Sequence, residues 1–147
     1  MIIADTGFWL ALANQRDRHH NAAIHALETI DEPLVTTWPV MTETCHLLTA
    51  RLSVDAELAF MENAAAGAFE IFALESRHLV RIRELMTKYR DLPMDLADAS
   101  LVVLAEERNS GRILSTDARD FKTYRWKNHK PFRNLMPSAP QDKKSKI

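Results

Sequence analysis

Four acidic residues stand where apolar runs meet helical segments, which are positions suited to chemistry. They are Asp5, Glu43, Asp98 and Asp117. Asp5 ends one short apolar strand, and Asp117 ends another. Ligands bind at the carboxyl ends of strands in open parallel sheets. Glu43 and Asp98 lie near the starts of two helices, from which both carboxylates can reach the same edge of the sheet.

Such a cluster needs a positive charge. Two carboxylates about 4 Å apart repel by roughly 1 kcal/mol in water and by several times more in a partly buried site. The four surrounding segments, ADTGF, MTETC, LADAS and LSTDA, contain no Lys or Arg. Ligation by oxygen alone is typical of Mg²⁺ or Mn²⁺. Either ion lowers the pKa of a bound water and stabilises charge at phosphorus, so the pattern predicts phosphodiester cleavage.

Polar neighbours of these acids are candidates for a supporting role. They are Thr6, Ser115, Thr116 and Asp120. Hydroxyls beside a ligand carboxylate can orient it or a water, and Asp120 can add a carboxylate to the rim. Equally, the hydroxyls suit backbone hydrogen bonding at strand ends, and Asp120 suits the cap of a short turn.

Each acid also has a structural alternative. Asp98 suits the third position of a capping box begun by Asp95. Glu43 suits a solvated helix face, and Asp5 and Asp117 suit caps of the elements that follow them. The conjunction of all four, rather than any one of them, favours a metal site.

The charge is divided unevenly along the chain. Residues 1–111 carry 9 basic against 17 acidic side chains, whereas residues 112–147 carry 10 against 3. Four aromatic residues are interleaved with the basic end: Phe121, Tyr124, Trp126 and Phe132. This composition favours binding of a polyanion whose bases can stack on aromatic rings, although it is also typical of a solvated surface. The basic residues expected to steer such a polyanion across the acids are Arg112, Arg119, Lys122 and Arg125.

The length and composition favour one globular domain. The chain has 147 residues, of which 46% are hydrophobic, enough to bury a core. We expect this domain to span residues 1–136, followed by a disordered basic tail at 137–147. No run approaches the roughly 18 apolar residues of a membrane helix, and no signal peptide is apparent, so a cytoplasmic location is expected. The single cysteine, Cys45, excludes an internal disulfide.

Strand and helix patterns alternate along the chain. Apolar runs predict strands at 2–4, 34–36, 69–72 and 112–115, with a less regular fifth at 132–135. Periodicity predicts helices at 19–29, 39–50, 54–65, 77–89 and 96–108, with Ser53, Ser76 and Asp95 as caps. This order predicts a three-layer α/β/α sandwich around a parallel sheet of about five strands.

These motifs together resemble the PIN-domain ribonucleases, most closely the VapC-type toxins of toxin–antitoxin pairs. The likeness covers roughly residues 1–135, with Asp5-Thr6-Gly7, His19-His20, Thr42-Glu43, Asp95-Leu-Ala-Asp98 and Ile113-Leu-Ser-Thr-Asp117 in order. Gly7 departs from the pattern, because relatives often have serine there. The resemblance implies Mg²⁺ or Mn²⁺ at the four acids and cleavage of single-stranded or looped RNA, such as tRNA or rRNA. It also implies a homodimer and a small antitoxin that covers the site.

Two other functions compete with this one. A catalytically silent PIN-like module that binds RNA or acts as a scaffold would keep the fold, but the complete set of acids argues against it. A receiver or an aspartyl phosphatase would need a second acid close to Asp5, and Gly7 occupies the expected place.

Overall fold

A five-stranded parallel sheet forms the centre of the protein in the computed structural model, which describes residues 1–137. Its strands are β1 (Ile2–Ala4), β2 (Leu34–Thr37), β3 (Glu70–Phe72), β4 (Arg112–Leu114) and β7 (Arg133–Asn134). The order is β3-β2-β1-β4-β7, and every neighbouring pair is parallel. The predicted parallel sheet is confirmed, and the less regular fifth strand adds to it beside β4.

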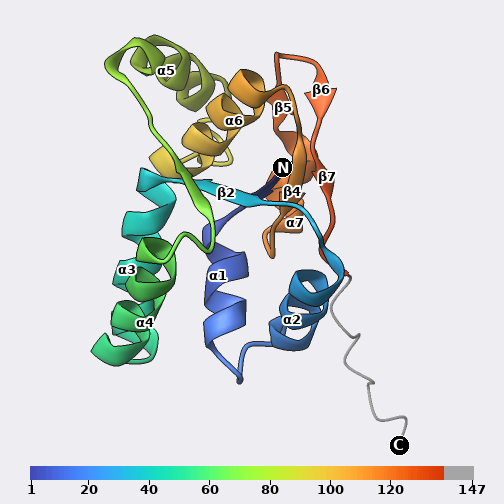
Figure 1. Cartoon of the computed structure of the whole chain (residues 1–147). Coiled ribbons are helices and arrows are strands. Elements are labelled where there is room, and N and C mark those ends of the chain that lie inside the picture. The colour runs from blue at the N-terminus through green and yellow to red at the C-terminus, as the bar shows by residue number, and fades with distance from the viewer. Residues whose placement is uncertain (138–147) are drawn as a thin grey trace, which may run out of the picture.

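Helices cover both faces of this sheet. They are α1 (Thr6–Ala13), α2 (His20–Thr29), α3 (Trp38–Arg51), α4 (Val54–Ala65), α5 (Leu79–Lys88), α6 (Leu96–Arg108) and α7 (Ala118–Thr123), with a 3₁₀ turn, η1 (Ser76–His78), before α5. Figure 1 shows α5 and α6 on one face and α1 and α2 on the opposite one. The predicted α/β/α sandwich is therefore confirmed.

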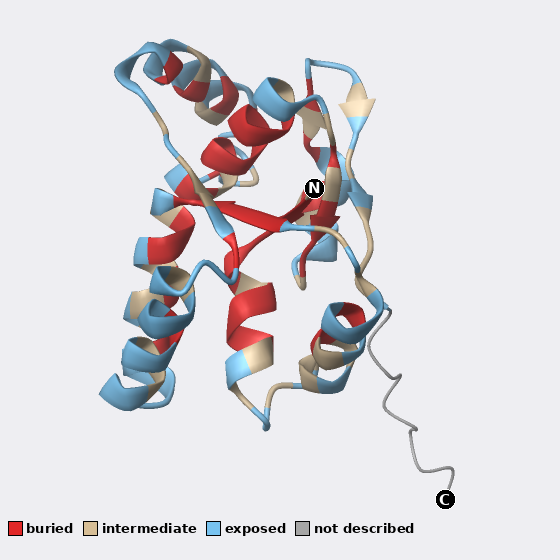
Figure 2. Ribbon diagram, viewed as in Figure 1, coloured by how far each residue is buried: buried red, intermediate tan, exposed pale blue. Residues whose placement is uncertain are grey.

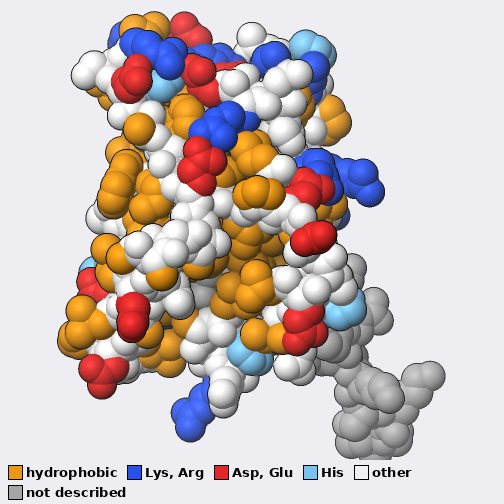
Figure 3. Space-filling model, viewed as in Figure 1, with side chains coloured by type: hydrophobic (Ala, Val, Ile, Leu, Met, Phe, Trp, Pro, Cys, Tyr) orange, Lys and Arg blue, Asp and Glu red, His pale blue; other side chains and the backbone are white. Residues whose placement is uncertain are grey.

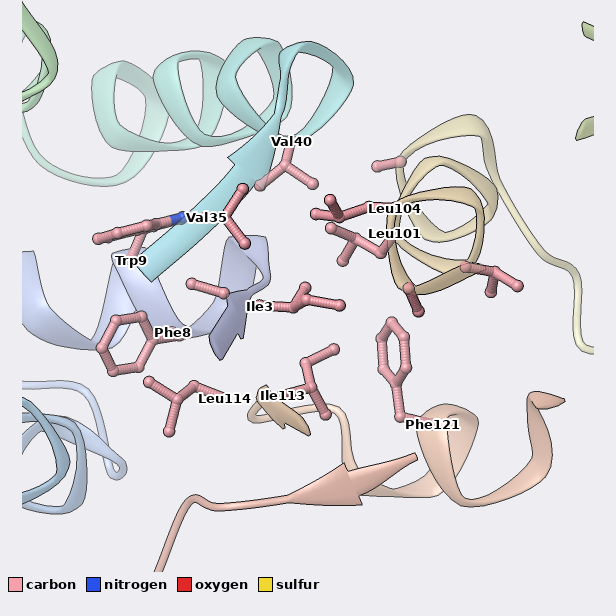
Figure 4. Close-up of a cluster of buried hydrophobic side chains, with 14 of the residues drawn as sticks. Ile3, Phe8, Trp9, Val35, Val40, Leu101, Leu104, Ile113, Leu114 and Phe121 are labelled. Carbon is pink, nitrogen blue, oxygen red and sulfur yellow. The ribbon is translucent and has the colours of Figure 1, made fainter. Parts of the chain in front are cut away.

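The core lies where the sheet meets α1 and α6. All three residues of β1 and all four of β2 are buried, and Figure 2 shows this burial continuing into both helices. In Figure 4, Leu101 and Leu104 of α6 lie on one side of β1, whereas Phe8 and Leu114 lie on the other. Burial on both faces explains why these strands read as continuous apolar runs. The sheet is thus a rigid support for the residues that follow its strands.

Three elements were not predicted from the sequence. Helix α1 is apolar along most of its length and buried from Phe8 to Ala11. Its sequence therefore lacks the alternation of apolar and polar residues, every three to four positions, that marks a half-exposed helix. Helix α7 has only six residues, and β5 (Arg125–Trp126) and β6 (Lys130–Pro131) form a hairpin of two residues per strand. Most of the predicted basic tail lies outside the described residues. No helix in the described part of the chain has the length and apolarity to cross a membrane.

The helix caps were only partly predictable. Ser53 accepts a hydrogen bond from the Ala56 backbone, and Asp95 accepts one from the Asp98 backbone, as expected. Ser76 was wrongly predicted to cap a helix: it begins η1, and the chain turns there because Glu75 and His78 form a reciprocal pair of hydrogen bonds. The predicted helix at 77–89 is therefore divided between η1 and α5.

Gly111 leaves room for an aromatic ring. A Cβ atom at this position would lie 2.2 Å from Nε1 of Trp126, whose side chain is buried. We expect Gly111→Ala to destabilise the fold by about 1–3 kcal/mol, because the ring has no space to retreat. Urea denaturation measures this loss, with Ser110→Ala as the neighbouring control. Equal midpoints for the two variants would contradict the packing argument.

Candidate active site

The four predicted carboxylates meet in one cavity. The strand order reverses between β1 and β4, and the carboxyl ends of neighbouring strands on either side of such a reversal form a crevice where ligands bind. Asp5 follows β1, Asp117 follows β4, Glu43 comes from α3 and Asp98 from α6. All four line a cavity of about 230 Å³, here called the acidic cavity. Thr6 and Thr116 also line it.

Asp5 is the most constrained of the four. Its Oδ1 accepts the Phe8 backbone N–H at 3.0 Å, which caps α1, and its Oδ2 accepts the hydroxyl of Ser115. Only 6% of the residue is exposed. Burial is the main reason that the pKa of Asp5 is raised to about 7, and the charges of Asp117 and Glu43 raise it further. The fold therefore holds this carboxylate in place at an electrostatic cost.

Asp98 and Glu43 are also unfavourably placed as anions. Burial, followed by the charge of Asp95, raises the pKa of Asp98 to about 7. The same two causes, burial first, raise the pKa of Glu43. The phenol of Tyr124 donates a hydrogen bond to Asp98 Oδ2 at 3.0 Å and fixes its orientation.

Asp95 and Tyr124 were missed as site residues. The cap pattern did identify Asp95, but not that its charge reaches Glu43 on another helix. Tyr124 lies 26 residues beyond Asp98, and no local pattern connects the two. Their contribution to the site is visible only in the folded structure.

The supporting residues lie beside the acids as the sequence suggested. Ser115 links two of them, because its Oγ also accepts the Asp117 backbone N–H at 2.9 Å. A hydrogen bond from Thr6 lowers the pKa of Glu43 and partly offsets its burial. The Asp120 backbone approaches Asp117 Oδ1 at 3.4 Å, and burial followed by Asp117 raises the pKa of Asp120. A structural role is thus visible for these residues, and their part in chemistry remains a prediction.

Gly7 and Thr116 share one space in the acidic cavity. A Cβ atom at Gly7 would lie 1.9 Å from Thr116 Oγ1 and 3.6 Å from Asp5 Oδ1. Because Gly7 has no side chain, the Thr116 hydroxyl can occupy this space next to Asp5.

We expect Gly7→Ala to lower the rate of RNA cleavage by about tenfold or more, because it displaces Thr116 and shifts groups around the reacting centre. Thr116→Ala in the same chain should recover part of this loss by vacating the space. Cleavage rates of both single variants and the double variant measure the coupling. Strictly multiplicative effects would show that the two residues do not compete for space.

The four predicted RNA-steering residues have different surroundings. Arg119 and Lys122 are exposed on α7, and their role in steering RNA stays a prediction. Arg125 donates to the carbonyls of residues 122–124 and caps the end of α7. The prediction for Arg112 is wrong. It lies at the amino end of β4, at the edge of the sheet away from the acids, and its Nη1 pairs with Glu32 at 2.7 Å.

The aromatic residues near the basic end are mostly internal. Phe121, Tyr124 and Trp126 are buried and cannot stack on a base, which corrects the interpretation drawn from their spacing. Phe132 is only half-buried. The local composition suggested a binding surface because core and surface residues alternate in this short segment.

Among residues 1–137, one basic residue reaches the acidic cavity. Arg51, the last residue of α3, lines its wall and is exposed, and it makes no ion pair within residues 1–137. The pKa values of Asp5, Glu43 and Asp98 are raised rather than lowered, so Arg51 does not neutralise them.

The acidic cavity fits a hydrated divalent ion. Within residues 1–137, no three acidic, His or Cys side chains converge closely enough to enclose a metal. Mg²⁺ does not require such a cage, because it keeps several waters and is usually bound through one or two carboxylates. An open cavity with four carboxylates, two of them with pKa values near 7, suits this mode of binding.

A larger apolar cavity lies elsewhere. It measures about 500 Å³ and is lined by residues of α1, α2 and α4, including Trp9 and Phe60, and none of its lining residues within the described part of the chain is titratable. Figure 3 shows hydrophobic side chains gathered on this face between the three helices. Because it contains no acid or base, we place the chemistry in the smaller acidic cavity.

Comparison with known proteins identifies the class. The sequence pattern of the PIN domain family matches residues 2–127, and the chain belongs to this family. Ribonuclease VapC26 of Mycobacterium tuberculosis is 32% identical over 124 residues, which cover 84% of this chain and 92% of that protein. The crystal structure of Mycobacterium tuberculosis VapC20, described as a sarcin-ricin loop cleaving toxin, gives a TM-score of 0.76 at 19% identity, covering 81% of this chain and 92% of that one. The predicted resemblance to the VapC-type PIN-domain proteins is confirmed.

Proposed function

We propose that this protein is an endoribonuclease that depends on Mg²⁺ or Mn²⁺ and acts as the toxin of a toxin–antitoxin pair. The observation that carries the proposal is the acidic cavity, where four elements of the fold bring carboxylates together at the reversal of strand order. Membership of the PIN-domain family and the likeness to ribonuclease VapC26 support it.

Asp5 and Asp98 would hold the metal, with Glu43 and Asp117 completing its surroundings. When bound, the ion would supply a water of lowered pKa and stabilise negative charge on the phosphodiester. Ser115 and Tyr124 keep the carboxylates of Asp5 and Asp98 in fixed orientations through their hydrogen bonds. Such fixed neighbours typically strengthen metal affinity about 10–100-fold.

Positive side chains flank the acids and would guide the phosphate backbone. Arg119 and Lys122 lie on the helix that begins after Asp117, and Arg51 lines the acidic cavity at the end of α3. Their charges would attract RNA to a cavity that by itself repels it. We propose a structured or looped RNA of the tRNA or rRNA class as the substrate. A cognate antitoxin, a homodimer and a cytoplasmic location complete the proposal.

Purified protein incubated with mixed tRNA and rRNA tests this function. We expect discrete fragments with Mg²⁺ or Mn²⁺, none with EDTA, and recovery when the metal is restored. Fragments that persist in EDTA would contradict metal dependence. Intact RNA in every condition, together with metal-independent RNA binding by the folded protein, would favour the silent PIN-like module.

A further inference from the structure

A second cavity adjoins the acidic one. It measures about 360 Å³, within the range typical of small-ligand sites, and the two cavities share Thr116 as a wall residue. We call it the flanking cavity; its residues include His19, Ser115, Phe121, Lys122, Phe132 and Asn134. They come from the start of α2, the end of β4, α7 and the region of β7, which Figure 1 shows gathered at one side of the sheet.

The walls of the flanking cavity are fixed by internal hydrogen bonds. The side-chain amide of Asn134 donates to the Ser115 carbonyl at 2.9 Å, and its oxygen accepts the backbone N–H groups of Ser115 at 3.2 Å and Met136 at 3.0 Å. The hydroxyl of Ser115 is already committed to Asp5. These groups shape the flanking cavity and are not available to a ligand.

Other polar side chains of the flanking cavity are available. Within residues 1–137, His19, Thr116 and Lys122 make no side-chain hydrogen bond or ion pair. Among residues 1–137, no acidic side chain lines the flanking cavity, in contrast to the four acids of its neighbour. An ammonium, an imidazole and a hydroxyl without a carboxylate are suited to a phosphate or ribose.

An apolar wall faces these polar groups. Phe132 is half-buried, and its ring packs edge to face on Phe121 with centroids 5.3 Å apart, so the buried ring supports the more exposed one. Met136 lies beside it in the same wall. A base that stacks on an aromatic side chain gains roughly 1–3 kcal/mol without regard to sequence. The flanking cavity thus combines a surface for a base with donors for a phosphate.

We propose that the flanking cavity binds the nucleotide next to the phosphodiester that is cleaved. Its base packs against Phe132 and Met136, while its phosphate and ribose contact Lys122, His19 and Thr116. Thr116 lines both cavities, so a nucleotide in the flanking cavity lies next to the acids. This inference rests on the proposed function, because it assigns part of the same RNA substrate.

Binding of single nucleotides in EDTA tests the proposal without cleavage. Full-length protein is titrated with AMP, CMP, GMP and UMP, and separately with inorganic phosphate, and isothermal titration calorimetry measures binding. We expect saturable binding of at least one nucleotide, weakened at least fivefold by Lys122→Ala. Phe132→Leu should weaken nucleotide binding while leaving phosphate binding unchanged. Lys88→Ala, which removes an exposed charge from α5, is the matched control and should bind as the wild type does.

Three results would overturn the assignment. They are the absence of saturable binding, nucleotide binding that neither Lys122→Ala nor Phe132→Leu weakens, and binding that Asp5→Asn abolishes. The last would place the nucleotide in the acidic cavity. Lys122 is exposed, so its removal should not affect folding, and thermal unfolding checks Phe132→Leu. If nucleotide binding fails these tests but the protein still cleaves RNA in an EDTA-sensitive way, only the assignment of the flanking cavity is rejected. If the proposed function itself is wrong, the cleavage assay shows no EDTA-sensitive fragments.

Discussion

Replacing Asp5 with Asn should slow RNA cleavage by at least about a thousandfold and leave the fold intact. Asn keeps the size of the side chain, can accept the Phe8 backbone N–H and can still contact Ser115. It removes the negative charge, however, and with it the attraction for a divalent ion whose electrostatic contribution is large. Single-turnover cleavage at saturating Mg²⁺ measures the rate, and circular dichroism checks the fold.

Asp91→Asn is the matched control for this experiment. Asp91 is exposed in the turn after α5 and does not line the acidic cavity, so the same chemical change there should leave the rate unchanged. If Asp5→Asn cleaves RNA within about tenfold of the wild-type rate, Asp5 is not a principal metal ligand.

The same substitution should stabilise the metal-free protein at neutral and alkaline pH. The pKa of Asp5 is raised from 3.8 to about 7, so the folded protein retains a proton between these values that the unfolded chain releases. Stability from this residue is therefore fully present below about pH 4 and is lost as the pH rises through 7. An asparagine has no charge to bury and escapes this loss.

We expect the advantage of Asp5→Asn over the wild type in EDTA to grow between about pH 4 and pH 7. The difference in unfolding free energy should increase by up to about 1.4 kcal/mol per pH unit and then level off. The full pKa difference corresponds to up to about 4 kcal/mol, so at roughly 3 °C for each kcal/mol the variant should melt up to about 12 °C above the wild type at pH 8. Saturating Mg²⁺ should reduce the difference, because it stabilises only the protein that binds it. A constant difference across the pH range would show that Asp5 is not the cause.

The position of the acids was predictable because the chain itself places them. Asp5 and Asp117 come directly after buried strands, and parallel strands bring such ends to one edge. Asp98 lies in the first turn of α6, whose continuous apolar run had to be buried. Strand polarity and burial are local signals, so the sheet and its acidic edge could be inferred from the sequence.

Contacts between distant elements were not predictable in this way. Arg112 was placed at the acids because it is close to Asp117 in the sequence, yet the length of β4 carries it to the other edge, where it meets Glu32. The burial of Tyr124 and its hydrogen bond to Asp98 depend on how α6 and the end of α7 pack together. Arg51 likewise reaches the acidic cavity only because α3 runs along it.

Titration of the protein with Mn²⁺, followed by electron paramagnetic resonance, tests the central claim most directly, since the signal reports free ion. We predict saturable binding to the wild type, competition by Mg²⁺, and weakening by at least about tenfold in Asp5→Asn and Asp98→Asn but not in Asp91→Asn. Equal binding by the wild type and all three variants, or no saturable binding by the wild type, would contradict the assignment of the acidic cavity as a metal site.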